Sequence, residues 1–176
     1  MAHPSRTLAS REKVMLRPAR PGDWSKIEGW IARPDIARWW GTASAAEAEI
    51  RMAWATDGAI ARIIEVGDVA AGYCHAIDAT YWGASLPDGM PAGTWDVDVV
   101  VAEPAYRSCG VGEAALDLIA EEVFGTTLAL ALSVIVAVTN EGAVRAYERA
   151  GFRWVKVWDD PILGPSWLML RERAGT

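Results

Sequence analysis

The segment Val99–Glu113 joins an apolar run to a glycine-rich turn and then to an amphipathic stretch. Within it, Arg107, Gly110 and Gly112 have the spacing Arg-x-x-Gly-x-Gly. Glycine lets a ligand approach the backbone closely, and the first turn of a helix presents free N–H groups at the positive end of its dipole. The motif therefore predicts a loop that binds a pyrophosphate group. It matches neither the P-loop nor the dinucleotide-binding glycine pattern, and an ordinary strand–turn–helix connection is the alternative interpretation.

A second group of residues, Asn140, Tyr147 and Gly151-Phe152, follows about 30 residues later. Asn140 is a suitable N-cap for a helix that Gly151 ends. Tyr147 lies seven residues after Asn140, which places both on one face, two turns apart. A buried tyrosine usually only finds a hydrogen-bond partner. Its hydroxyl can also protonate a leaving thiolate, because the pKa values of phenols and thiols are close.

Both motifs, in this order and at this separation, resemble the two cofactor motifs of the GNAT N-acetyltransferase superfamily. The resemblance implies that acetyl-CoA is the cosubstrate and that its thioester faces the backbone of one central strand. It also implies that Tyr147 acts as the acid for the leaving thiolate. The implied cofactor contacts are Val99, Val100, Val101, Arg107, Cys109, Gly110, Val111, Gly112, Glu113, Asn140 and Tyr147.

A narrower resemblance is to the aminoglycoside 6'-N-acetyltransferases. The similar segments are Trp30–Gly41, Ala71–Tyr73, Tyr81-Trp82 and Ala143–Phe152. In that family an aspartate on the central strand contacts the substrate amine, and Asp98, twelve residues before Gly110, matches it. The family also has an acidic residue on the strand before the Asn-capped helix, and this chain has none between Leu132 and Val138.

Asp98 is the first candidate for orienting the ammonium group of a substrate and accepting its proton. Asp96 lies two residues away, so both side chains of a strand point to the same face, where two carboxylates raise each other's pKa. Glu103 and Asp78 are weaker alternatives for the base. Trp40 and Trp82, together with Trp39, are candidates for the wall of the acceptor pocket, and Asp96 and Asp98 for binding the acceptor. His75 is interpreted as a core histidine whose hydrogen bonds are satisfied.

The function predicted from these residues is acetyl transfer to a primary amine of a small molecule, with the 6'-amino group of an aminoglycoside as the first candidate. Direct transfer within a ternary complex is favoured, because no nucleophile for an acyl-enzyme is evident. The alternatives are acetylation of a protein N-terminus or lysine, acyl transfer to a siderophore hydroxylamine, and a CoA-binding module without catalysis.

Hydrophobic periodicity predicts the elements that position these residues. Strands are expected at 14–18, 60–66, 69–77, 95–101, 128–138, 152–158 and 167–170. Helices are expected after Asp23, from Pro34 to Gly41, after Ser44, and over 110–124 and 140–150. This order predicts a mixed α/β (α+β) domain around one twisted sheet. The resemblance implies the GNAT acyl-CoA N-acyltransferase fold, a mostly antiparallel sheet with splayed central strands and flanking helices.

The 176 residues fit one domain, expected at 14–172 after a disordered segment at 1–13. No apolar run is long enough for a membrane span or a secretory signal, so we expect a cytoplasmic protein with no membrane partner. The net charge of -6 argues against nucleic acid and suits a cationic substrate. Two cysteines and two histidines offer no cluster with metal-ligand spacing, so no metal is predicted. Monomer and homodimer both remain open.

Overall fold

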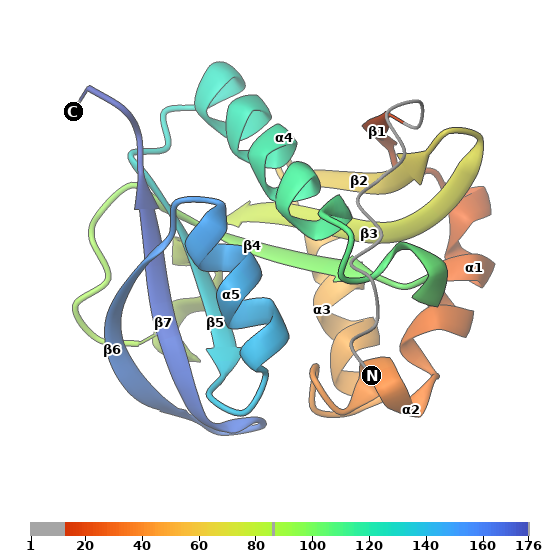
Figure 1. Cartoon of the computed structure of the whole chain (residues 1–176). Helices are drawn as coiled ribbons and strands as arrows, with labels where there is room; N and C mark the ends of the chain where they lie inside the picture. The colour runs from red at the N-terminus through yellow and green to blue at the C-terminus, as the bar shows by residue number, and fades with distance from the viewer. Residues whose placement is uncertain (1–12, 86, 176) are drawn as a thin grey trace, which may run out of the picture.

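The computed structural model, which describes residues 13–85 and 87–175, contains a seven-stranded sheet in the order β1-β2-β3-β4-β5-β7-β6 (Figure 1). The strands are β1 (Val14–Pro18), β2 (Ile60–Val66), β3 (Val69–Asp78), β4 (Thr94–Val101), β5 (Ala131–Ala137), β6 (Arg153–Asp160) and β7 (Gly164–Glu172). The α-helices are α1 (Trp24–Ile31), α2 (Pro34–Ala37), α3 (Ala43–Ala55), α4 (Val111–Thr126) and α5 (Glu141–Arg149). Short 3-10 helices cover η1 (Pro21–Asp23), η2 (Ala79–Ser85) and η3 (Pro104–Tyr106).

The helices pack on both faces of the sheet (Figure 1). On one face, α4 and α5 bury residues such as Leu116, Ile119 and Val144 against the strands. On the other, α1 and α3 pack around Tyr73, whose hydroxyl accepts a hydrogen bond from the indole of Trp54 at 3.0 Å. Two separate apolar clusters thus hold the sheet between two helical layers, as in a domain with one sheet at its centre. No helix among the described residues is long and apolar enough to cross a membrane.

The central strands β4 and β5 separate part of the way along their length. They are the one parallel pair in the sheet, and their pairing ends at Asp96, opposite Ser133. Beyond that point β4 continues to pair with β3 as far as Val101, while β5 pairs with β7. The predicted mostly antiparallel sheet with splayed central strands is therefore confirmed.

The two helices that begin at the sequence motifs start where the motifs predict. Asn140 caps α5, and its side-chain oxygen accepts a hydrogen bond from the backbone N–H of Ala143 at 3.3 Å. Gly110 is the N-cap of α4 and has φ of 90°, a left-handed conformation that favours glycine. Both helix starts are thus specified by a local residue choice.

One predicted helix cap is wrong. Ser44 does not cap α3, because the chain is already helical at Ala43 and the extended Thr42 accepts the N–H of Ala45 at 3.1 Å. Asp23 occupies the N-cap position of α1 as predicted, but its carboxylate forms an ion pair with Arg17 at 2.7 Å and makes no capping hydrogen bond to that helix.

Two predicted strand starts are also wrong. The strand expected from residue 167 begins at Gly164. The strand expected from residue 128 begins at Ala131. Leu128 is 93% exposed, and the hydroxyl of Thr127 accepts the N–H of Ala129 in a turn that precedes the strand. Of the predicted segment 1–13, residues 1–12 lie outside the described residues.

Gly72 on β3 provides a test of the close contact between β3 and β4. A Cβ atom at this position would lie 2.1 Å from the carbonyl oxygen of Val100. We expect Gly72→Ala to lower the free energy of unfolding by about 1–3 kcal/mol, the usual cost of overpacking a tight contact. Chemical denaturation monitored by tryptophan fluorescence measures the change.

The matched control is Gly29→Ala on α1, where a Cβ atom would meet nothing within 4 Å. Alanine favours the helix more than glycine does, so this variant should gain about 0.5–1 kcal/mol. An equal effect of the two substitutions would contradict the close β3–β4 contact.

Candidate active site

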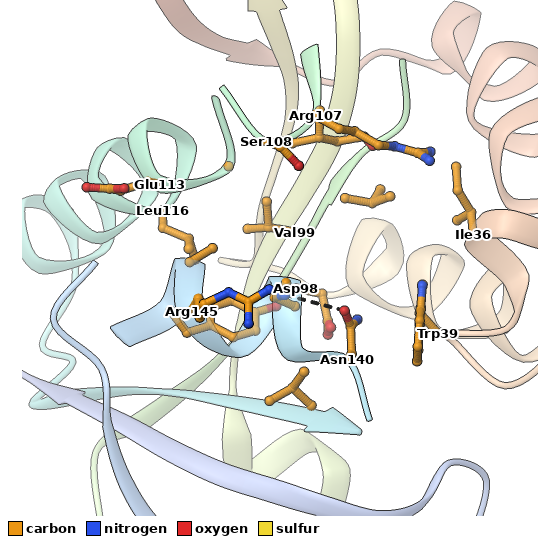
Figure 2. Close-up of a pocket in the computed structure, with 18 of the residues that line it drawn as sticks. Ile36, Trp39, Asp98, Val99, Arg107, Ser108, Glu113, Leu116, Asn140 and Arg145 are labelled. Atoms are coloured by element: carbon orange, nitrogen blue, oxygen red, sulfur yellow. Dashed lines mark hydrogen bonds between the residues drawn. The ribbon is translucent and has the colours of Figure 1, made fainter. Parts of the chain in front are cut away.

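A cavity of about 690 Å³ opens where β4 and β5 separate (Figure 2). One wall comes from the segment around α2, and the opposite wall from the first turns of α4 and from α5. The lining includes Asp35, Ile36, Arg38, Trp39, Trp40, Asp98, Val99, Val100, Val101, Arg107, Ser108, Gly110, Gly112, Glu113, Leu116, Asn140, Arg145, Tyr147 and Arg149. Most of the predicted site residues therefore lie around one cavity, and a ligand in it can extend from α4 across β4 to α2.

The free edge of β4 forms the floor of the cavity. Val99, Val100 and Val101 line it beyond the last pairing with β5. Alternate N–H groups of a strand point toward opposite neighbours, so those that face the missing partner are available to a ligand. Such fixed backbone donors can stabilise an oxygen that becomes negative during a reaction.

The loop before α4 places open backbone at one end of the cavity. Gly110, Gly112 and Glu113 line the cavity at the start of the helix, where N–H groups have no partner within the helix. Cys109 and Val111 do not line it. The thiol of Cys109 donates to the carbonyl oxygen of Tyr106 at 3.0 Å, and Val111 is buried in the core.

Arg107 has its guanidinium group engaged within the protein. It donates to the carbonyl oxygens of Val101 and Ala102, each at 2.9 Å, and to the carboxylate of Asp35 at 2.7 Å. Arg107 lines the cavity, but these contacts hold the end of β4 and the start of α2 in place. Its predicted contact with a pyrophosphate group stays a prediction.

Asn140 and Tyr147 both lie on α5 and line the cavity, as their spacing predicts. Tyr147 is buried and packs edge-on against Phe152 with 5.8 Å between ring centroids. Burial raises the pKa of the Tyr147 hydroxyl, and the negative charges of Asp98 and Asp96 raise it further. The hydroxyl therefore keeps its proton at neutral pH and can donate it.

Asp98 lies beside a second carboxyl group, that of Glu49 on α3. Burial is the main cause that raises the pKa of Asp98, and the charge of Glu49 raises it further. The pKa of Glu49 is raised to about 7, also chiefly by burial. Two such groups in contact cannot both ionise easily, so they are able to share one proton near neutral pH. This is the electrostatic setting of a general base.

His75 on β3 completes this group, and its interpretation as a satisfied core histidine is wrong. It is fully buried, but neither ring nitrogen has a hydrogen-bond partner among the described residues. Its Nε2 atom lies 3.6 Å from Oδ2 of Asp98 and 3.7 Å from Oε1 of Glu49. Burial lowers the pKa of His75 to about 4, so the ring is neutral at pH 7.

Asp96 is on the same face of β4 as Asp98 but is buried below the cavity and does not line it. Its carboxylate accepts a hydrogen bond from Ser133 on β5 at 2.8 Å. Burial and the charge of Asp98 raise the pKa of Asp96 to about 7. Its predicted contact with a substrate stays a prediction. The negative charge of Asp96 helps to raise the pKa of Glu49 and of Tyr147.

The tryptophans predicted to wall the acceptor pocket divide into two groups. Trp39 and Trp40 line the cavity, and the indole of Trp40 donates to Oε1 of Glu49 at 3.0 Å. Trp82, on η2, does not line it. Its indole nitrogen is buried without a hydrogen-bond partner among the described residues. The structure therefore supports an aromatic wall on the α2 side only.

The sequence analysis did not identify Glu49 as a site residue. Glu49 is adjacent to Ile50 on the face of α3 that packs on the sheet, and an acidic residue next to a buried position is the signal that could have found it. Arg145 and Arg149 on α5 were also missed; they line the cavity and could contact phosphate oxygens.

The arrangement can support acyl transfer between a bound thioester and an amine. It combines a carboxyl pair able to take a proton, a tyrosine able to give one, free backbone donors on β4, and a helix start suited to phosphate. All these groups except Glu49, which lies beside Asp98, line one cavity, so they can act on a single reacting centre.

The fold has close structural relatives. The first is the aminoglycoside acetyltransferase AAC(6')-Ib in complex with coenzyme A, with a TM-score of 0.79 and 23% identity, covering 92% of this chain and 95% of that one. The same enzyme with ribostamycin and coenzyme A gives a TM-score of 0.79 and 22% identity, with 92% and 94% covered. An aminoglycoside N(6')acetyltransferase from Legionella pneumophila gives a TM-score of 0.68 and 18% identity, covering 89% of this chain and 90% of that one.

No curated protein sequence matches the chain significantly. The sequence does match the model of a protein family described as an acetyltransferase (GNAT) domain, over residues 20–160. This range includes the free edge of β4, the start of α4 and all of α5. The chain therefore belongs to the GNAT acetyltransferase family, and it is an acetyl-CoA-dependent N-acetyltransferase.

Proposed function

We propose that the protein transfers the acetyl group of acetyl-CoA to a primary amine of a cationic small molecule, and that the 6'-amino group of an aminoglycoside is the first acceptor to test. The observation that carries this proposal is the partly buried pair of carboxyl groups at the acceptor side of the cavity, formed by Asp98 and Glu49, whose side chains are 26% and 25% exposed. A cavity with carboxylates at its base and tryptophans at its wall suits an ammonium group on a sugar.

Two further observations support a small acceptor. The structural relatives with TM-scores of 0.79 include complexes of an aminoglycoside acetyltransferase with ribostamycin and with kanamycin. The tryptophan side chains of residues 39 and 40 line the α2 side of the cavity and offer apolar faces to a sugar ring. The net charge of -6 also attracts polycationic ligands over a distance.

Acetyl-CoA supplies the acetyl group as a thioester. In the proposed reaction Asp98, with Glu49 beside it, orients the ammonium group and accepts its proton. The amine nitrogen then forms a bond to the thioester carbon, and free N–H groups of Val99–Val101 stabilise the carbonyl oxygen. The carbon–sulfur bond breaks, and Tyr147 gives its proton to the leaving sulfur. The nitrogen loses its second proton as the amide forms, and a proton returns to Tyr147 through solvent.

The remaining contacts position the cosubstrate. We propose that the backbone N–H groups at Gly110, Gly112 and Glu113 hold the pyrophosphate, and that Asn140 contacts the pantetheine arm. Arg145 and Arg149 are exposed cations on the same wall that could contact phosphate oxygens, and each forms an ion pair with a glutamate, Glu141 and Glu113 respectively. Arg107 positions the end of β4.

Replacing the proposed base should slow the reaction without weakening cosubstrate binding. We expect Asp98→Asn to lower kcat/KM for the amine by about 10²–10⁴-fold, the usual contribution of a general base, with the Kd for acetyl-CoA unchanged. Thiol release from acetyl-CoA measures the rate. Asp78→Asn is the matched control, because Asp78 lies on β3 outside the cavity and its carboxylate only binds Thr80. Equal losses in both variants would count against the assigned base.

Removing the proposed acid tests the other proton transfer. Tyr147→Phe keeps the ring that packs on Phe152 and deletes only the hydroxyl. We expect kcat to fall by about 10²-fold or more, because the thiolate must leave without a positioned proton donor, while KM for the amine changes little. A variant with the wild-type kcat would remove Tyr147 from the mechanism.

A panel of acceptors tests the substrate class. The panel contains aminoglycosides with and without a 6'-amino group, linear polyamines and short peptides, all assayed by thiol release. We expect turnover with 6'-amino sugars and little with peptides, because tryptophans that line the α2 side of the cavity suit a sugar ring. Turnover with polyamines alone would keep the acetyltransferase and overturn the aminoglycoside assignment.

A further inference from the structure

Three ligand atoms of the kind that bind transition metals converge at the base of the acceptor side. They are Oε1 of Glu49, Nε2 of His75 and Oδ2 of Asp98, and all lie within 4.8 Å of one another. They come from α3, β3 and β4, so residues distant in sequence form the group. His75 and Asp98 are opposite each other in the register of β3 and β4, which places both side chains on one face.

His75 has no role in the proposed acetyl transfer and no hydrogen-bond partner for either ring nitrogen among the described residues. A fully buried polar group without a partner is costly and calls for an explanation. Its Nε2 atom faces two carboxyl groups without making a hydrogen bond to either, at 3.6 and 3.7 Å. Once the two carboxyl groups lose the proton that they share, they and an unprotonated imidazole nitrogen all present lone pairs to the space between them, which a cation would satisfy.

The spacing of these atoms suits a tetrahedral ion. Zinc bonds of about 2.0–2.2 Å to imidazole and carboxylate hold neighbouring ligand atoms about 3.3–3.6 Å apart. The observed separations from Nε2 agree with this to within a few tenths of an ångström. One carboxylate is already fixed in place, because Trp40 donates to Oε1 of Glu49, as outer partners of metal ligands usually do.

We propose that Glu49, His75 and Asp98 form a binding site for Zn²⁺ and similar first-row divalent ions, with the fourth position open to the cavity. The negative charge of Asp160, which acts on both Glu49 and Asp98, adds to the attraction. Because imidazole selects zinc-like ions over hard cations, Mg²⁺ binds weakly here. The ion binds Asp98, where the substrate ammonium is proposed to lie. Because acetyl transfer needs no metal, a bound ion inhibits the enzyme by excluding the amine.

Cobalt binding tests the site independently of activity. CoCl₂ is titrated into the full-length protein and followed by visible absorption, and ZnCl₂ is then added to displace it. We expect one ion per chain with tetrahedral bands, displaced by ZnCl₂ and resistant to excess MgCl₂. His75→Gln and Asp98→Asn should each weaken binding by at least about tenfold. Circular dichroism confirms that each variant is folded.

Two controls exclude adventitious binding. Glu47→Gln makes the same kind of change on α3, but Glu47 forms an ion pair with Arg51 outside the group, so binding should not change. The second control, His3→Ala, removes the other histidine in the chain and should also leave binding intact. Absence of cobalt binding, or equal binding by wild type and His75→Gln, would overturn the proposed metal site.

The inhibition rests on the proposed function and is tested separately. ZnCl₂ should raise the apparent KM for the amine, leave that for acetyl-CoA unchanged, and lose its effect when EDTA is added. If the metal binds as expected but acetylation is unaffected, the metal site stands and the placement of the amine at Asp98 fails. Inhibition that persists undiminished in His75→Gln would overturn the metal site as its cause.

Discussion

The separation of β4 from β5 is the constraint on which the site depends. The parallel pairing stops at Asp96 and Ser133, and each strand then follows its antiparallel neighbour. A strand edge inside a fold leaves backbone donors and acceptors that need partners. In this protein Arg107 binds the carbonyl oxygens of Val101 and Ala102. Alternate backbone N–H groups of Val99–Val101 point away from β3 and toward the cavity. One gap in the sheet therefore supplies both the binding space and the groups that act on a carbonyl oxygen.

The same gap explains how two ligands can meet. The two helical layers lie on opposite faces of the sheet, with α4 and α5 on one and α3 on the other (Figure 1). Asp98 and Glu49 belong to the α3 side, whereas Tyr147 belongs to the α5 side. In a continuous sheet the strands would separate these groups. Because β4 and β5 part, the cavity connects both faces, and a proton acceptor and a proton donor can reach opposite sides of one reacting carbon.

The three acidic residues at the base of the cavity, Glu49, Asp96 and Asp98, repel one another when all are ionised and no cation is bound. Burial raises the pKa values of Asp96, Asp98 and Glu49, and their mutual repulsion adds to the effect. The neutral His75 beside them offers no positive charge at pH 7. A buried carboxyl group in such surroundings either keeps a proton or binds a positive ligand. The preference for cationic ligands therefore follows from the local charge balance and does not depend on which amine is the natural substrate.

The sequence allowed the fold and part of the site to be predicted. It did not reveal the site residues that meet only through contacts between separate elements. Asp98, Asn140 and Tyr147 could be placed because each has a fixed spacing from a helix start within one motif. Glu49 could not, because α3 approaches β4 only through tertiary packing. His75 reaches Asp98 through the strand register, which a lone histidine in an apolar strand does not reveal.

The ion pair between Arg107 and Asp35 connects the end of β4 to α2, both of which line the cavity. Arg107 holds the end of β4, where the thioester is proposed to lie, and Asp35 begins the segment that carries the tryptophan wall. Trp40 in that segment in turn fixes Glu49 beside Asp98. Both the acceptor wall and the carboxyl pair are therefore positioned relative to the same strand. This series of contacts limits the relative movement of the base and the carbonyl donors, and such fixed geometry is what acyl transfer in one ternary complex requires.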